Sequence, residues 1–338
     1  PGDGRICDLF SGSGTVSRYF AQSRPVTAVD IQEYSRVLCS AVLMPTRFPF
    51  TGSEFVTSVK ATKKYATLST AFEPLLSYER TATESAKEGD ITHLYNLIAN
   101  GSIIIAEKGF QVTSQELSTA IRDSLQLLDK MGLGNSVDTM VTRYFGGLYF
   151  SAEQAICIDA ALDYIHSQVA VVSMRNSLLA ALLGATSEIV NTVGKQFAQP
   201  LQVFDKDGKP KRKLLKKILD DRAISFWKPF EEWINAYSTL EPTPFDSHEV
   251  LRLDFHDALK QLQQSDVAVV YADPPYTRYH YSRYYHVLET ICLRDLPEIS
   301  PTFVGSTQLS RGIYREGRHQ SPFCIRSKAG KAFDHLFA

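Results

Sequence analysis

Residues 267–276 of this 338-residue chain are Val-Ala-Val-Val-Tyr-Ala-Asp-Pro-Pro-Tyr. The apolar run at the start of this stretch predicts a buried parallel β-strand. The strand should end at Asp273, because Pro274 and Pro275 have no amide N–H for a further ladder bond. Ligands of open α/β sheets bind at the C-terminal ends of strands. We therefore expect a carboxylate, two proline carbonyls and a tyrosine ring at a binding edge, a set suited to a flat base with an exocyclic amine. Taken alone, the four residues are equally consistent with a Pro-rich turn.

A strand-turn-helix pattern at the start of the chain predicts the same kind of sheet. Its expected elements are a strand at 5–9, a tight turn at 11–15, a helix at about 15–22, a strand at 26–29 that ends on Asp30, and a helix at 33–43. This order is the beginning of a doubly wound α/β sheet.

The turn of this pattern contains two glycines that suit a ligand site. Gly12 and Gly14 let the backbone approach a ligand without a Cβ in the way, and the following helix offers its unpaired N–H groups. Dinucleotide enzymes share G-x-G, but Ser17 replaces the third glycine of their fingerprint, which favours a smaller nucleoside ligand. Asp30 is placed to accept hydrogen bonds from both ribose hydroxyls, or to act as a strand-ending cap.

The middle of the chain lacks this alternation of strands and helices. We expect residues 51–90 to be irregular or loosely helical, Thr113 and Glu116 to form a capping box for a helix ending near Met131, and further helices at about 152–167 and 170–189. The α/β pattern resumes with a strand at 251–255, a helix at 257–264 and a strand at 267–272. The aromatic residues between 226 and 237 are expected in a core.

These patterns predict three parts of the chain. Residues 1–45 and 246–338 form the two parts of one α/β sheet, and residues 46–245 form a large, mainly helical insertion between them. Because the chain begins with Pro1 rather than Met, we expect its native N-terminus to be missing.

Composition restricts the class of protein. Hydrophobic residues make up 44% of the chain and charged residues 22%, as in soluble globular proteins, and no apolar run has the ~18 to 20 residues needed to span a bilayer. Five cysteines without a CxxC pair predict buried thiols in a reducing cytosol, and the histidine spacings predict no metal site. The net charge of −1 does not indicate nucleic-acid binding, but residues 205–217 hold seven basic and two acidic residues.

The two motifs together resemble the DNA adenine-N6 methyltransferase family. Residues 8–15, Asp-Leu-Phe-Ser-Gly-Ser-Gly-Thr, match its FxGxG cofactor motif, and residues 273–276 match its DPPY motif. In the subgroup that this chain resembles, FxGxG precedes a target recognition domain and DPPY follows it, which is the order found here. The similarity continues through residues 279–290, and the blocks at 144–150 and 191–200 look like recurring parts of such enzymes.

The resemblance implies a Rossmann-like, S-adenosylmethionine-dependent methyltransferase sheet. The cofactor residues that it implies are Asp8, Phe10, Gly12, Gly14, Asp30 and Asp257, the last of which can instead be a simple helix cap. The catalytic residues that it implies are Asp273, Pro274, Pro275 and Tyr276. The expected DNA contacts are Lys209, Lys211, Arg212, Lys213, Lys216, Lys217 and Arg278, with a solvated surface loop as the alternative for the basic segment.

The partners follow from the same resemblance. Double-stranded DNA is the expected substrate, in a prokaryotic cytoplasm close to the nucleoid, and a restriction endonuclease is a candidate partner. The family also has a cofactor-binding segment before FxGxG, so a chain that is truncated at its N-terminus is expected here.

Three other functions fit parts of the pattern. A cytosine-N4 or RNA base methyltransferase is the nearest, although Asp273 favours adenine. A nicotinamide dehydrogenase is disfavoured by Ser17 and by DPPY. A DNA-binding remnant without catalytic activity fits the missing upstream segment.

Overall fold

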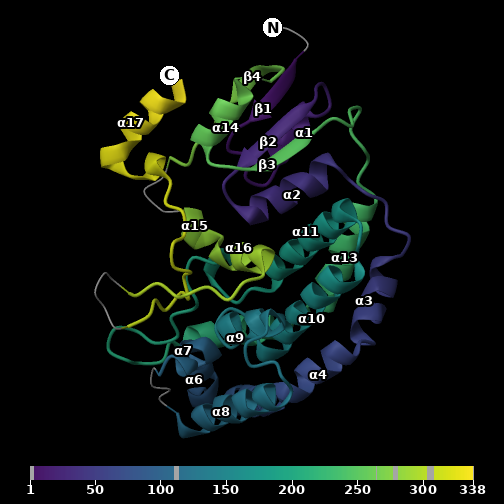
Figure 1. Cartoon of the computed structure of the whole chain (residues 1–338). Helices are drawn as coiled ribbons and strands as arrows, with labels where there is room; N and C mark the ends of the chain where they lie inside the picture. The colour runs from purple at the N-terminus through teal and green to yellow at the C-terminus, as the bar shows by residue number, and fades with distance from the viewer. Residues whose placement is uncertain (1–3, 110–113, 264, 277–280, 303–307, 338) are drawn as a thin grey trace.

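One sheet of four parallel strands is assembled from both ends of the chain. The computed structural model describes residues 4–109, 114–263, 265–276, 281–302 and 308–337 (Figure 1). The strands are β1 (Arg5–Asp8), β2 (Val26–Asp30), β3 (Glu249–Arg252) and β4 (Val267–Tyr271), in the spatial order β3-β2-β1-β4. β1 pairs in parallel with both β2 and β4, so the Gly-rich turn and DPPY follow neighbouring strands.

Helices cover both faces of this sheet. Val26 and Ala28 of β2 pack toward α1 (Thr15–Phe20) and α2 (Glu33–Leu43). Val29 of β2 joins Cys7 and Leu9 on the other face, where they pack against α14 (Phe255–Leu262) and α17 (Arg326–Phe337). This period of two is the pattern of a strand whose two faces are both covered, and it agrees with the expected Rossmann-like α/β architecture.

The strand that precedes DPPY lies at an edge of the sheet. Within the described residues β4 pairs with β1 alone, and Val269, Val270 and Tyr271 are 40%, 43% and 36% exposed. The prediction of a buried strand was wrong. A valine-rich run indicates that a strand forms, but the position of that strand within the sheet depends on contacts between residues that are distant in sequence.

The third strand and its helix begin earlier than predicted. β3 ends at Arg252 rather than at Phe255, and α14 begins at Phe255 rather than at Asp257. Asp254 is the N-cap of α14, where its side chain accepts a hydrogen bond from the His256 N–H at 2.9 Å. An N-cap at this position stops the strand before Phe255.

The residues between β2 and β3 form regular helices. These are α3 (Gly52–Lys60), α4 (Lys63–Ala71), α5 (Glu73–Lys87), α6 (Thr92–Asn100), α7 (Ile103–Glu107), α8 (Gln115–Lys130), α9 (Met140–Phe145), α10 (Ala152–Gln168), α11 (Val172–Ile189), α12 (Leu215–Ala223) and α13 (Trp227–Ser238). Residues 51–90, which were expected to be irregular or loosely helical, form regular helices, because Thr51 and Thr62 cap helices there. Thr113 lies outside the described residues, and Ser114 caps α8.

The largest core lies in the helical part and includes α2. Tyr34, Val37 and Ala41 of α2 belong to the same buried cluster as Phe226 and Phe230, so the aromatic residues near 226–237 are core residues as expected. The cluster also contains residues of α16 (His286–Leu293), which follows the short helix α15 (Tyr281–Tyr284). Figure 1 shows α2, α15 and α16 between the sheet and the helices α3–α13.

Two further expectations about the whole chain can be compared with the structure. All five cysteines are buried and free, as predicted. Among the described residues, no helix combines the length and the apolar character that crossing a membrane requires.

Candidate functional site

A cavity of about 260 Å³ lies at the C-terminal edge of the sheet. Segments that follow all four strands form its walls, so the two ends of the chain meet there. Its lining includes Phe10, Gly12, Asp30, Gln32, Asp254, Phe255, Asp273, Pro274, Pro275, Tyr276, Tyr281, Ser282 and His319. The volume is close to the ~300 Å³ at the lower end of small-molecule sites.

Hydrogen bonds join the Gly-rich turn to the end of β2. The Gly12 N–H donates to Asp30 Oδ2 at 3.1 Å, and the Gln32 N–H donates to Asp30 Oδ1 at 2.9 Å. Ser35 Oγ donates to the Gly12 carbonyl oxygen at 2.6 Å. Gly12 has a positive φ of 52°, and a Cβ built there would meet nothing nearer than the Phe10 carbonyl oxygen at 4.0 Å. The turn therefore presents open backbone to the cavity.

The Asp30 carboxylate remains available to a ligand from the cavity. Each carboxylate oxygen can accept more than one hydrogen bond, so its two backbone bonds leave acceptor capacity. Burial raises the pKa of Asp30, while the N–H groups of Gln32 and Gly12 act in the opposite direction.

Asp8 and Gly14 support the turn from behind. Asp8 is buried and accepts a hydrogen bond from Ser17 Oγ at 2.6 Å, and burial raises the pKa of Asp8. Gly14 has a φ of 79°, and a Cβ there would lie 2.9 Å from Val42 Cγ2 and 3.2 Å from the Cys39 Cα. Neither residue is among those that line the cavity. In this structure the first positions α1 for packing and the second permits close contact with α2.

One predicted cofactor residue lies outside the cavity. Asp257 lies in the first turn of α14, has a side chain that is 66% exposed, and is 3.7 Å from Lys260 Nζ. It does not line the cavity, whereas Asp254 does. The shift follows from the earlier end of β3. Phe10 and Phe255 lie beside Asp254 with ring centroids 5.7 Å apart.

The DPPY residues, which follow the strand next to that of the Gly-rich turn, form another part of the cavity wall. Asp273 is exposed to the cavity side, and the Tyr276 ring is 76% exposed. The Pro275 carbonyl oxygen lies 3.5 Å from Cys324 Sγ. Arg278, predicted to contact DNA, and Tyr279 lie outside the described residues.

Sequence reasoning missed polar residues of the cavity. Gln32 Oε1 and Ser282 Oγ are buried and have no hydrogen-bond partner within the part of the chain that the structure describes. Both residues line the cavity. Ser282 is part of the 279–290 block, which was a usable signal, but no motif marked Gln32.

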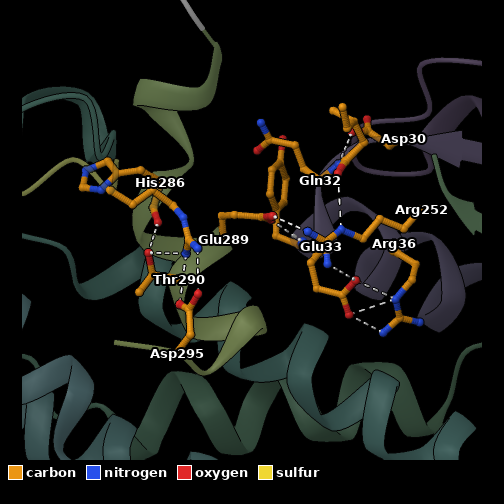
Figure 2. Close-up of polar contacts among 12 residues, drawn as sticks. Asp30, Gln32, Glu33, Arg36, Arg252, His286, Glu289, Thr290 and Asp295 are labelled. Atoms are coloured by element: carbon orange, nitrogen blue, oxygen red, sulfur yellow. Dashed lines mark hydrogen bonds and ion pairs between the residues drawn. The ribbon is translucent and has the colours of Figure 1, made fainter. Parts of the chain in front are cut away.

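Glu289 was also missed, although it links two parts of the site. Its carboxylate accepts a hydrogen bond from the Tyr34 N–H at 3.0 Å, at the start of α2, and lies 3.8 Å from Arg252 Nη2 (Figure 2). Burial raises the pKa of Glu289. The carboxylate therefore fastens α16, which follows DPPY, to the helix that follows Asp30.

The basic segment is only partly gathered in one place. Lys211 and Lys213 line a groove that is separate from the cavity. Arg212 donates to the Gly89 carbonyl oxygen at 3.2 Å, and Lys217 forms an ion pair with Asp221. No contact of the Lys209 or Lys216 ammonium group with a carboxylate is present among the described residues.

The fold and the cavity define a class of protein, an α/β protein with a cavity at the carboxyl edge of a parallel sheet, where such sheets bind ligands. Over 68 residues the chain is 43% identical to the type II methyltransferase M.FokI of Planomicrobium okeanokoites. The matched stretch covers 20% of this chain and 9% of that protein. No family model matches the chain, and no solved structure matches it.

Proposed function

We propose that the protein is a site-specific DNA adenine-N6 methyltransferase, which moves a methyl group from S-adenosylmethionine to an adenine flipped out of double-stranded DNA. The observation that carries the proposal is that the Gly-rich turn and DPPY, from opposite ends of the chain, line one cavity. The partial likeness to a type II methyltransferase supports the same class.

The residues present fit an adenosyl cofactor. Gly12 leaves open space beside its backbone, and the Asp30 carboxylate, which lines the cavity, would accept the ribose hydroxyls. Asp254 replaces Asp257 as the acceptor for the adenine amine, with Phe10 and Phe255 beside it. When bound, S-adenosylmethionine supplies a methyl group that is already activated by a sulfonium.

The DPPY residues would activate and hold the target base. The amine of adenine is a poor nucleophile because its lone pair is delocalised into the ring. The Asp273 carboxylate and the Pro274 carbonyl oxygen each accept one N–H, which directs the lone pair toward the methyl carbon. The amine would gain the methyl group as the bond between that carbon and the sulfonium sulfur breaks and leaves a neutral thioether, and the amine would release one proton to water. Tyr276 stacks on the base, a contact worth ~1–3 kcal/mol, and offsets the few kcal/mol that flipping costs.

The helical part would recognise the DNA. We assign residues 46–245 to target recognition because this part lies between the two sheet-forming parts in sequence and packs on α2. On the family resemblance, the enzyme acts in a prokaryotic cytoplasm, alone or beside a restriction endonuclease.

Replacement of Asp273 by alanine tests the proposal. Because in-line transfer depends on positioning, Asp273→Ala should lower methyl transfer by ~100-fold or more. Cofactor affinity should be nearly unchanged, since Gly12 and Asp30 remain. The measurements are incorporation of labelled methyl groups into plasmid DNA and calorimetric titration with S-adenosylmethionine.

Asp257→Ala is the matched control, because Asp257 lies outside the cavity and should leave both values near those of the wild type. Near-wild-type transfer in Asp273→Ala would overturn the proposal. Analysis of the nucleosides in the product DNA separates N6-methyladenine from N4-methylcytosine, which would correct the base and keep the enzyme class.

A further inference from the structure

A second concave region lies next to the cavity, between the helical part and the segment after DPPY. Two adjoining hollows of about 660 and 650 Å³ share Gln199, Gln202, Arg283 and Tyr314. We call the two hollows together the Arg283 groove. Lys211 and Lys213 line one hollow, and Arg311 and Arg318 line the other.

Two guanidinium groups share one tyrosine ring in this groove. The Cζ atoms of Arg283 and Arg318 lie 5.4 and 5.1 Å from the centroid of the Tyr314 ring. The Tyr314 hydroxyl donates to the Ala198 carbonyl oxygen, and its backbone N–H donates to Ser310 Oγ at 3.0 Å. Tyr314 is thus fixed at its hydroxyl and at its backbone, so its ring face stays in position for cation–π contacts.

Among the residues that the structure describes, the groove carries more basic than acidic side chains. Five basic residues line it, Lys211, Lys213, Arg283, Arg311 and Arg318, against one acidic residue, Glu316. None of the five is in an ion pair among the described residues, and Arg318 Nε is buried without a hydrogen-bond partner there. Burial and the neighbouring Arg283 lower the pKa of Arg318. Like charges held together in this way favour a bound anion.

Two segments of the chain line both the groove and the cavity, each with different residues. Arg318 and Gln320 line the groove, whereas the alternate residues His319 and Ser321 line the cavity. At α15, Ser282 lines the cavity and the adjacent Arg283 lines the groove. A polyanion in the groove would therefore be separated from the cavity by these shared segments alone.

We propose that the Arg283 groove holds the sugar-phosphate backbone of the DNA strand that carries the target base. Arg283 and Arg318 contact phosphates beside the flipped nucleotide, and Lys211 and Lys213 contact them from the opposite wall. The inference rests on the proposed function and assigns its phosphate-binding site. A nucleotide that leaves the duplex needs its flanking phosphates fixed next to the pocket that receives the base.

The salt dependence of DNA binding tests the assignment. Binding of a short fluorescein-labelled duplex of random sequence is measured by anisotropy at several salt concentrations. Each lost phosphate contact should lower the slope of log K against log [salt] by about 1, so Arg283→Gln and Arg318→Gln should each lose about 1 and the double variant about 2. The charge-conserving Arg283→Lys and Arg318→Lys should keep slopes near the wild-type value.

Lys260→Gln is the control, because Lys260 is an exposed lysine on α14, outside the groove, the cavity and the part of the chain assigned to target recognition. Thermal melting confirms that each variant folds, and calorimetry with S-adenosylmethionine should give unchanged affinity. A wild-type slope in both arginine-to-glutamine variants, or the same loss in Lys260→Gln, would overturn the groove assignment while the methyltransferase proposal stands. The same test is run with a single-stranded RNA. If the wild-type protein bound this RNA more tightly than the duplex, and the arginine-to-glutamine variants lost the same slope with it, the groove would be assigned to RNA and the assignment to a DNA strand would be overturned. A wild-type protein that binds the duplex but not the cofactor would contradict the proposed function alone.

Discussion

Gly12 and Gly14 show how one short motif serves two purposes. Both have a positive φ, 52° and 79°, a region that favours glycine over other residues. Beyond that shared feature, Gly12 faces open space at the cavity, whereas Gly14 is in contact with α2. The motif therefore combines a ligand surface with a packing constraint.

Replacing each glycine should separate these two effects. Gly14→Ala should destabilise the fold by ~1–3 kcal/mol or more, because backbone strain adds to the close approach of Val42. Cofactor affinity should change little. Gly12→Leu should lower cofactor affinity by ~10-fold or more, equivalent to ~1.4 kcal/mol. Chemical denaturation and calorimetric titration measure the two effects.

Gly89→Ala supplies the control for backbone strain, because Gly89 has a φ of 108° and nothing within 4 Å of a built Cβ. A loss of stability in Gly14→Ala no greater than in Gly89→Ala would contradict the packing role of Gly14.

Elements in this chain are held at their ends by side chains that are distant in sequence. Asp159 of α10 accepts hydrogen bonds from the backbone N–H groups of Val141 and Thr142, at 2.9 and 2.8 Å, at the start of α9. The Thr142 hydroxyl donates to the same carboxylate at 2.7 Å. Burial raises the pKa of Asp159 to about 7 in spite of these three bonds. α9 ends within the 144–150 block, whose Tyr149 hydroxyl donates to the Phe197 carbonyl oxygen at 3.1 Å.

The Asp159 carboxyl should make stability depend on pH. Its pKa of about 7 in the folded protein exceeds its ordinary value of 3.8, so the folded state binds the proton more tightly. Its contribution to stability is full below pH 3.8 and is lost as the pH rises to about 7. Asp159→Asn should lower the free energy of unfolding by ~1–3 kcal/mol, since the amide N–H group of the new side chain would face the backbone N–H donors of α9. Its deficit relative to the wild type should widen as the pH falls toward 4.

Urea denaturation of both proteins across this pH range measures the deficit. Asp123→Asn, an exposed aspartate on α8, is the control and should show a constant difference from the wild type. A deficit that narrows toward low pH would mean that the three hydrogen bonds keep Asp159 ionised.

At the scale of the whole molecule, α2 joins the sheet to the helical part. Cys39 and Leu43 of α2 pack on the sheet, while Val37 and Ala41 belong to the large helical core. Glu289 adds a polar link between α16 and the start of α2. We infer that the sheet and the helical part unfold together.

Val37→Ala should therefore weaken both parts. Val37 is fully buried, so its truncation should cost ~1.5–3 kcal/mol. Tryptophan fluorescence follows α13, which contains Trp227 and Trp233, and hydrogen exchange follows the amides of β1 and β2. The free energies of unfolding obtained from the two measurements should fall by the same amount. Val171→Ala is the control, since Val171 is 54% exposed. Loss of protection in the helices alone would show that the two parts unfold independently.

The sequence was sufficient for features that depend on near neighbours. The strands at the start of the chain, the Gly-rich turn, the helix at 33–43 and the helices near 152–167 and 170–189 were all predicted, because their caps, glycines and apolar periods lie within a few residues of one another. The same local logic failed at 251–257, where the N-cap at Asp254 ended the strand early and moved the cavity carboxylate from Asp257.

Only the tertiary structure decided which distant residues meet. The sequence by itself determined that a Gly-rich turn and a DPPY turn each follow a strand, since both are written in contiguous residues. Packing between segments far apart in the chain makes β1 and β4 neighbours and leaves β4 as an exposed edge. It also brings Arg283, Tyr314 and Lys211 to one groove. Such contacts arise from the fit of whole elements, for which no local pattern of residue types is a signal.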